Sequence, residues 1–127
     1  MSQLILVVED QEDNRRILRD LLTNSGYEVI EAVNGLEGVS FAVTFRPDLI
    51  LMDIQLPGID GYEATRQIKA NPELKEIPLI VVTSYALSGD DLKAFEAGCD
   101  AYVAKPFSPR ILLAKIREYL PLTFEEK

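Results

Sequence analysis

Histidine is absent from this chain of 127 residues, and cysteine occurs once, as Cys99. Without histidine, the chain cannot use a histidine general base, bind a metal through imidazole or form a phosphohistidine of its own. A single cysteine excludes an internal disulfide and any metal site built from paired cysteines. Chemistry carried out by this chain must therefore rely on carboxylates, hydroxyls and lysine.

Positive charge and long apolar segments are also scarce. The chain has 13 lysine and arginine residues against 21 aspartate and glutamate residues, which gives a net charge of −8. Because such a surface repels nucleic-acid phosphates, we expect no direct binding to nucleic acid. No apolar run approaches the roughly 20 residues needed to cross a bilayer, and no basic segment precedes the first apolar run as it would in a signal peptide. We expect a soluble, cytoplasmic protein without a membrane partner.

The chain does contain a regular alternation of short apolar runs and amphipathic segments. Three of the apolar runs are near-continuous stretches of valine, isoleucine and leucine, which are typical of strands buried on both faces of a parallel sheet. The predicted strands are Leu4–Val8, Glu28–Ala32, Leu49–Met52, Leu79–Val82 and Ala101–Ala104.

A segment with helical spacing follows each predicted strand. The first helix ends at Gly26, the second has Asn34 as its N-cap, and the last has Ser108 as its N-cap with Pro109 in the first position. The other predicted bounds are about Phe45 for the end of the second helix, about Tyr62 to Ala70 for the third, and from after Ser88 to Gly98 for the fourth. The predicted buried stripes are Ile17, Leu18, Leu21, Leu22 and Ser25 on the first helix and Leu112, Leu113, Ile116 and Leu120 on the last.

Alternation of strand and helix, repeated five times, predicts a doubly wound α/β domain with right-handed crossovers. We expect one domain over residues 1–127 that ends in a short acidic tail at 122–127. In such sheets the ligand site lies beyond the carboxyl ends of the strands. The polar residues at these ends are Glu9 and Asp10, Asp53, Thr83 and Ser84, and Lys105 before Pro106.

Each of these residues alone has a simpler interpretation. Glu9 or Asp10 can cap the following helix, Asp53 can belong to a turn, and Lys105 can be a solvated charge. Together they indicate more, because three carboxylates in one crevice repel one another unless a cation is present. A hard divalent ion with oxygen ligands fits best, which favours Mg²⁺.

The remaining polar groups suit a phosphoryl group. Lys105 supplies a compact positive charge for a phosphoryl oxygen, and the hydroxyl of Thr83 can donate a hydrogen bond to another. A carboxylate, Mg²⁺, a lysine and a hydroxyl are the parts required for phosphoryl transfer to an aspartate.

These segments resemble the receiver domains of two-component response regulators. The resemblance extends from Leu4 to about Leu120 and is carried by several motifs in order. They are Val7-Val8-Glu9-Asp10, the run from Asp48 to Asp53, the loop Leu56-Pro57-Gly58-Ile59-Asp60-Gly61, Val82-Thr83-Ser84, and the stretch from Ala97 to Tyr102 that leads into Lys105-Pro106-Phe107.

The resemblance implies a flavodoxin-like fold, with five parallel strands in the order 2-1-3-4-5 and five helices. It also implies that Asp53 is the phosphoacceptor, that Asp10 binds Mg²⁺ directly, and that Glu9 binds it through water. Asp53 and the backbone carbonyl of Gln55 complete the protein's share of the coordination, and Mn²⁺ can substitute for the ion. Lys105, Thr83 and Ser84 contact the phosphoryl group, Thr83 and Tyr102 form the switch pair, and the bond before Pro106 is cis.

The resemblance further implies a stand-alone switch rather than an enzyme, with at most slow self-dephosphorylation. The donor is a phosphohistidine on a sensor histidine kinase or a histidine phosphotransfer protein, and a downstream protein target reads the change of shape. Our hypothesis is that Gln55 and Tyr85 screen the site from water and lengthen the phosphorylated lifetime.

The output surface is expected on the fourth helix, the fifth strand and the fifth helix, where Ile111 is a candidate exposed contact. Arg15, Arg16 and Arg19 can form a basic patch for the donor or simply a solvated helix face.

Three other functions share the predicted fold or part of the site. A phosphatase with an aspartate nucleophile normally needs a second acid two residues after the nucleophile, where this chain has Gln55. A flavodoxin-like FMN carrier needs a phosphate loop after the first strand, where Glu9 to Asp13 are acidic apart from Gln11. A pseudo-receiver that acts as an unphosphorylated adaptor is disfavoured because every phosphorylation residue is present.

Overall fold

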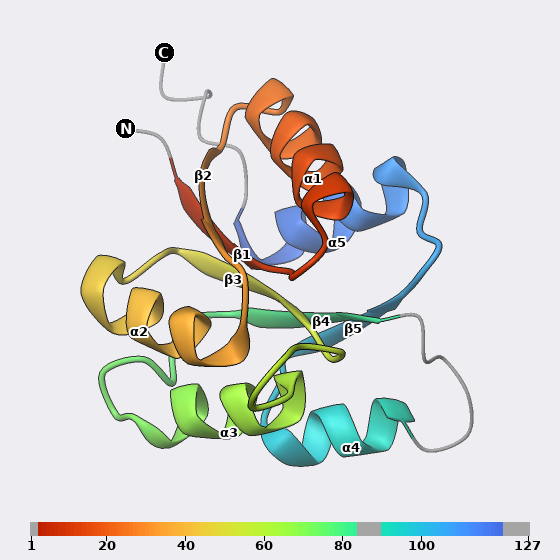
Figure 1. Ribbon diagram of the computed structural model, residues 1–127. Coiled ribbons are helices and arrows are strands. Elements are labelled where there is room, and N and C mark those ends of the chain that lie inside the picture. Colours follow the sequence, from red (N-terminus) through yellow and green to blue (C-terminus); the bar gives the residue numbers. More distant parts are fainter. Residues whose placement is uncertain (1–2, 84–89, 121–127) are drawn as a thin grey trace.

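The computed structural model describes residues 3–83 and 90–120, which form a five-stranded parallel sheet between two layers of helices (Figure 1). The strand order is β2-β1-β3-β4-β5, as expected. The strands are β1 Leu4–Val8, β2 Glu28–Ala32, β3 Leu49–Asp53, β4 Leu79–Thr83 and β5 Ala101–Ala104. β3 and β4 each run one residue further than expected, so that Asp53 and Thr83 are the last residues of their strands.

The helices follow the strands in strict alternation. They are α1 Glu12–Asn24, α2 Gly35–Phe45, α3 Gly61–Ala70, α4 Asp90–Ala97 and α5 Pro109–Tyr119. The expected N-caps are present, since the side chain of Asn34 accepts a hydrogen bond from Glu37 N and that of Ser108 accepts from Arg110 N and Ile111 N. Ser88 and the tail at 122–127 lie outside the described residues.

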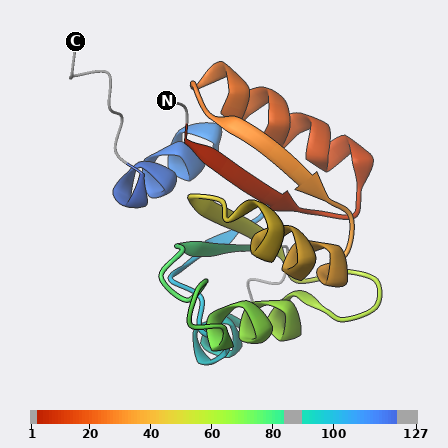
Figure 2. The same ribbon diagram turned by 90° about the vertical axis from the view of Figure 1, so that its left-hand side faces the viewer.

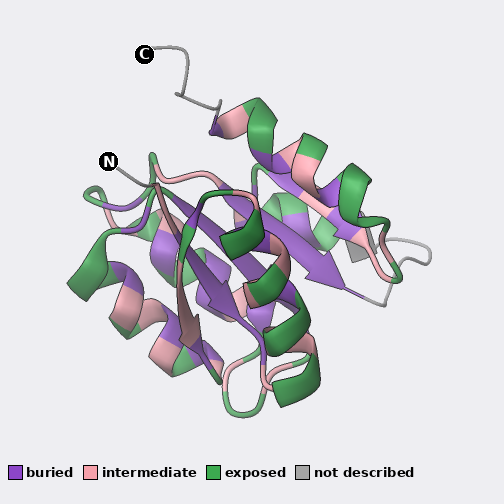
Figure 3. Ribbon diagram, turned by 90° about the horizontal axis from the view of Figure 1, so that it is seen from above, coloured by how far each residue is buried: buried purple, intermediate pink, exposed green. Residues whose placement is uncertain are grey.

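Two apolar cores separate the sheet from its helices. α1 and α5 cover one face, where Leu18, Leu22, Leu112 and Ile116 are buried, and α2, α3 and α4 cover the other (Figures 1 and 2). Figure 3 shows the central strands buried and the helices exposed on their outer sides. Every residue of β3 and β4 is buried, which explains their continuous apolar sequences.

Four side chains of the predicted stripes depart from full burial, and Ser25 is one of those that are only partly buried. Ile17 is 57% exposed, because the contact face of α1 is centred on Leu18 and Leu22 and Ile17 lies at its edge. Leu21 and Leu113 are only partly buried and pack against the margin of the same core. No helix among residues 3–83 and 90–120 is long and apolar enough to span a membrane.

Candidate functional site

The alternation of side chains along the strands brings three of the predicted site residues to one face of the sheet. Val7, Leu51 and Val103 belong to the core beneath α1 and α5. Side chains two positions apart on a strand share a face, so the residues two positions after these three, at the strand ends, lie on the same side of the sheet. These residues are Glu9, Asp53 and Lys105.

Three carboxylates meet at this edge. Glu9, Asp10 and Asp53 each offer an oxygen, and these oxygens all lie within 4.8 Å of one another. Glu9 and Asp53 are buried, with 1% and 7% of their surface exposed, whereas Asp10 is partly exposed. Burial, reinforced by the negative charge of Glu9, raises the pKa of Asp53 from 3.8 to about 6, although Lys105 acts in the opposite direction. The ionised form of Asp53 is therefore disfavoured in this cluster, and a cation bound beside it would offset the repulsion from Glu9.

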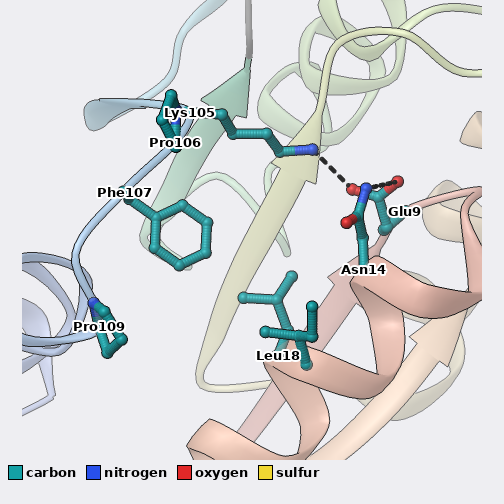
Figure 4. A pocket seen from close by; sticks show the side chains of 8 residues that line it. Glu9, Asn14, Leu18, Lys105, Pro106, Phe107 and Pro109 are labelled. Carbon is teal, nitrogen blue, oxygen red and sulfur yellow. Dashed lines mark hydrogen bonds and ion pairs between the residues drawn. The ribbon is translucent and has the colours of Figure 1, made fainter.

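Lys105 reaches across the site from the end of β5. Its Nζ lies 2.9 Å from Oε1 of Glu9 (Figure 4). The same Nζ lies 3.5 Å from Oδ2 of Asp53. Its backbone N–H donates to the carbonyl of Thr83 at 2.7 Å, which ties the lysine to the end of β4. The peptide bond to Pro106 is cis, the isomer that the resemblance implies. The ammonium group thus lies between two of the three acids.

Backbone donors hold the two buried carboxylates in place. Gln11 N donates to Oε2 of Glu9 at 3.1 Å, and the side chain of Asn14 lies 3.5 Å from the same oxygen. Ile54 N donates to Oδ1 of Asp53 at 2.7 Å. Among the described residues no donor contacts the carboxylate of Asp10. This partly exposed carboxylate, beside two that are already oriented, suits a hard divalent cation with oxygen ligands.

Two pockets adjoin the acids. One, of about 340 Å³, is lined by the three carboxylates together with Gln11, Asn14, Gln55 and Lys105. The other, of about 390 Å³, lies between α1 and the segment 105–109 and has mostly apolar walls. Leu18, Pro106, Phe107 and Pro109 line it, with Glu9, Asn14 and Lys105 at one end (Figure 4). The exposed Ile17 also lines the second pocket.

The predicted switch pair lies on the opposite face of the sheet. Val81 belongs to the core beneath α2, α3 and α4, and Thr83 follows it by two residues on β4. Tyr102 is the register partner of Val81 on β5 and packs, partly buried, against the same core. Thr83 is fully buried. Thr83 and Tyr102 therefore share a face, while Ser84 and Tyr85 lie outside the described residues.

The predicted basic patch on α1 is largely neutralised. Arg15 and Arg19 both form ion pairs with Glu31 of β2, at 3.3 and 2.8 Å, and Arg16 pairs with Asp13 at 3.2 Å. The side chain of Arg15 is only 15% exposed, so it is not part of an accessible surface. Because all three arginines are paired with neighbouring acids, the structure favours a helix face with internal ion pairs over a free docking patch for the donor.

Three features of the site carried no recognised signal in the sequence. Asn14 and Arg15 support the acid pair from the start of α1, and their spacing from Glu9 matches no motif that we identified. Gly61 lies against the end of β3, in a loop noted in the sequence only for its resemblance to the receiver family.

On the expected output surface, Ile111 is 60% exposed, in agreement with its position off the core stripe of α5.

Comparison with known proteins defines the class. Residues 5–117 match the family model described as the response regulator receiver domain, and the chain belongs to this family. Receiver domains are phosphoacceptor switches of bacterial two-component systems and receive phosphoryl groups from histidine kinases.

Individual relatives match along nearly their whole length. The polar-differentiation response regulator DivK of Brucella anthropi is 46% identical over 120 residues, which cover 94% of this chain and 98% of that protein. The receiver domain of the sensor histidine kinase PA1611 from Pseudomonas aeruginosa PAO1, solved with a magnesium ion coordinated in its active site cleft, has a TM-score of 0.89 and 37% identity, covering 96% of this chain and 100% of that one. CheY4 of Vibrio cholerae has a TM-score of 0.88 and 25% identity, covering 94% and 99%.

Proposed function

We propose that this chain is a response regulator in which Asp53 accepts a phosphoryl group from the phosphohistidine of a partner protein. The observation that carries the proposal is the arrangement of Glu9, Asp10 and Asp53 within 4.8 Å of one another, with Lys105 at the same edge. The chain has no histidine, so the phosphohistidine must belong to a sensor histidine kinase or a histidine phosphotransfer protein.

In this proposal a carboxylate oxygen of Asp53 attacks phosphorus. A P–O bond forms as the P–N bond to the partner's imidazole breaks, and the nitrogen keeps the electron pair. Ile54 N holds Oδ1 of Asp53 at 2.7 Å and so fixes the orientation of the carboxylate. The Nζ of Lys105, now 2.9 Å from Glu9, turns to the arriving phosphoryl oxygens and offsets their charge.

The acids would also hold a metal ion. Asp10, Asp53 and the backbone carbonyl of Gln55 would bind Mg²⁺ directly and Glu9 through water, with Mn²⁺ as a substitute. When bound, the ion offsets the negative charge shared by the carboxylates and the phosphoryl group. The magnesium ion in the cleft of the PA1611 receiver domain supports this assignment.

The change of shape would pass through the other face of the sheet. In this proposal the hydroxyl of Thr83 moves to the phosphoryl group, with Ser84 as a further contact, and the ring of Tyr102 turns into the vacated space. The common face of Thr83 and Tyr102 on neighbouring strands supports such coupling. A downstream protein target would then recognise α4, β5 and α5, with Ile111 as one contact.

Acetyl phosphate tests the proposal without a partner. We expect intact-mass analysis to show one added phosphoryl group when Mg²⁺ is present and none with EDTA. An acyl phosphate is cleaved by hydroxylamine, so the adduct must disappear on that treatment. An adduct that forms equally with EDTA, or that resists hydroxylamine, contradicts the proposal. A chain that takes up no phosphoryl group under any condition would instead be an unphosphorylated adaptor.

Gln55 is expected to limit the loss of the phosphoryl group. Its exposed side chain lines the acidic pocket beside Asp53, where it can screen the acyl phosphate from water. We expect Gln55→Ala to shorten the phosphorylated lifetime several-fold, as measured from the decay of the phosphorylated mass after removal of acetyl phosphate. The matched variant Gln67→Ala, exposed on α3, should decay like the wild type. Equal decay of all three proteins would remove this role of Gln55. Tyr85→Ala tests the other half of the hypothesis in the same way.

Ile17 is expected to contact the phosphodonor. It is exposed at the rim of the apolar pocket that adjoins the acids, where a protein that delivers a phosphoryl group to Asp53 must approach. We expect Ile17→Asp to slow transfer from a phosphorylated histidine kinase about 10-fold or more, because it places a charge in a contact that excludes water. Phosphorylation by acetyl phosphate should be unchanged, and Ile111→Asp should leave both reactions unchanged. Equal loss with both donors would show that the site itself had been damaged.

A further inference from the structure

Arg15 connects the first turns of α1 to the backbone of the acid pair. Its Nη1 donates hydrogen bonds to the carbonyl oxygens of Glu9 at 3.0 Å and Asp10 at 3.1 Å. Its Nε lies 3.3 Å from Oε1 of Glu31. One guanidinium group therefore binds two successive peptide carbonyls and a carboxylate at the same time.

Glu31 anchors this guanidinium to the sheet. It lies on β2, where it is the register partner of Val7 on β1, two residues before Glu9. Arg19 binds its second oxygen at 2.8 Å, so both oxygens of the Glu31 carboxylate are engaged. The side chains of Arg15 and Glu31 are 15% and 23% exposed, and ion pairs that are partly shielded from water are screened less than exposed ones.

We propose that Arg15, held by Glu31, is a positioning residue that fixes the backbone of Glu9 and Asp10 for binding a divalent cation. The inference rests on the proposed function of this site, since it assigns the support of the acids that would hold Mg²⁺. Among the contacts of the described residues, Arg15 bonds to neither carboxylate of the pair. It bonds instead to the two backbone carbonyls, and so fixes the direction in which the side chains of Glu9 and Asp10 project from the backbone.

The sign of the effect separates positioning from simple electrostatics. Removing a positive charge near three carboxylates should strengthen the binding of a cation, since the repulsion between the two cations is lost. Removing a positioning contact should weaken it, and supporting contacts of this kind typically contribute about 10- to 100-fold to metal affinity. A weaker affinity after loss of a cation cannot be explained by charge alone.

Arg15→Met tests the inference because it keeps much of the apolar stem and loses every hydrogen bond. The matched control is Arg16→Met, which removes the same charge from the next residue, whose side chain is 57% exposed and contacts Asp13. Titration calorimetry with Mg²⁺ should give a dissociation constant about 10-fold larger for Arg15→Met than for the wild type. Arg16→Met should bind Mg²⁺ as tightly as the wild type or slightly more tightly.

Phosphorylation by acetyl phosphate provides a second readout. For Arg15→Met the Mg²⁺ concentration at half-maximal rate should rise about 10-fold, while the rate at saturating Mg²⁺ stays close to that of the wild type. A general loss of structure would lower the saturated rate as well. Arg15→Lys keeps the charge and can reach fewer of the three acceptors, so its Mg²⁺ affinity should fall between those of Arg15→Met and the wild type.

The outcomes distinguish the two proposals. If the wild type binds Mg²⁺ and Arg15→Met binds it equally or more tightly, the inference is overturned and the proposed function stands. If the wild type itself does not bind Mg²⁺, both are overturned. Should Arg15→Met fail to fold, the Mg²⁺ affinity of Arg15→Lys is compared with that of Arg16→Met. An affinity of Arg15→Lys equal to or higher than that of the wild type then overturns the inference.

Discussion

Asp53→Asn is expected to lose all phosphorylation and, in metal-free buffer, to be more stable than the wild type. The amide is a poor nucleophile and cannot form the acyl phosphate, so no phosphoryl group should be added with acetyl phosphate and Mg²⁺. The gain in stability has a separate cause. Burial and the charge of Glu9 raise the pKa of Asp53 to about 6, so an ionised Asp53 is unfavourable in the folded protein.

The gain should depend on pH in a defined direction. Well below pH 4 Asp53 is protonated in both the folded and the unfolded chain, and the wild type suffers no penalty. As the pH rises from about 4 to 6, the unfolded chain releases this proton and the folded chain retains it, so the wild type loses stability. Above pH 6 the loss is nearly complete, and we expect the free energy of unfolding of Asp53→Asn to exceed that of the wild type by about 3 kcal/mol.

Urea unfolding at several pH values, in EDTA and in Mg²⁺, measures this difference. In Mg²⁺ the advantage of Asp53→Asn should shrink, because a cation bound to the folded wild type stabilises it. The control is Asp13→Asn, since the side chain of Asp13 is 82% exposed and should change stability little at any pH. A less stable Asp53→Asn at pH 7 in EDTA would contradict the electrostatic argument. A phosphoryl adduct on this variant would contradict the assignment of Asp53.

The fold was largely predictable because its signals are local and repeated. Apolar runs of four or five residues, each followed by a segment with helical spacing, defined all five strands and the order of strand and helix. Caps such as Asn34 and Ser108 marked helix starts because their side chains bond to backbone N–H groups only a few residues away. The order of the strands in the sheet came from the family resemblance, since no local pattern determines which strands are neighbours.

The convergence of the acids and the lysine at one edge of the sheet was predictable, and their individual contacts were less so. Strand ends meet at one edge of a parallel sheet, so the convergence of Glu9, Asp53 and Lys105 followed from the strand assignments. Their mutual geometry did not follow. Lys105 contacts Glu9 more closely than Asp53, and Arg15 binds backbone carbonyls, which carry no mark in a sequence. Arg15 therefore looked like one of several surface charges until its partners were visible.

Gly61→Ala is expected to cause the largest loss of stability among these substitutions. A Cβ at this position would lie 2.1 Å from the carbonyl oxygen of Asp53 and 2.7 Å from Cα of Ile54. Both are backbone atoms of the β3 end, so neither can move aside as a flexible side chain would. We expect the free energy of unfolding to fall by about 3 kcal/mol or more, at the upper end of the cost of overpacking.

The same close approach makes Gly61 important for the site. Gly61 N donates to the carbonyl of Ile54 at 2.9 Å, and α3 begins directly against the residues that present the Asp53 carboxylate. A shift that relieves the clash must displace Asp53, so Gly61→Ala should also weaken Mg²⁺ binding in whatever fraction remains folded.

Gly58→Ala is the contrasting variant, because Gly58 has a φ of 78° but no atom within 4 Å of the added Cβ. It should lose only about 1 to 2 kcal/mol for the left-handed conformation and keep its affinity for Mg²⁺. Equal losses of stability in the two variants, measured by urea unfolding, would show that backbone conformation rather than the contact with β3 explains the glycine at position 61.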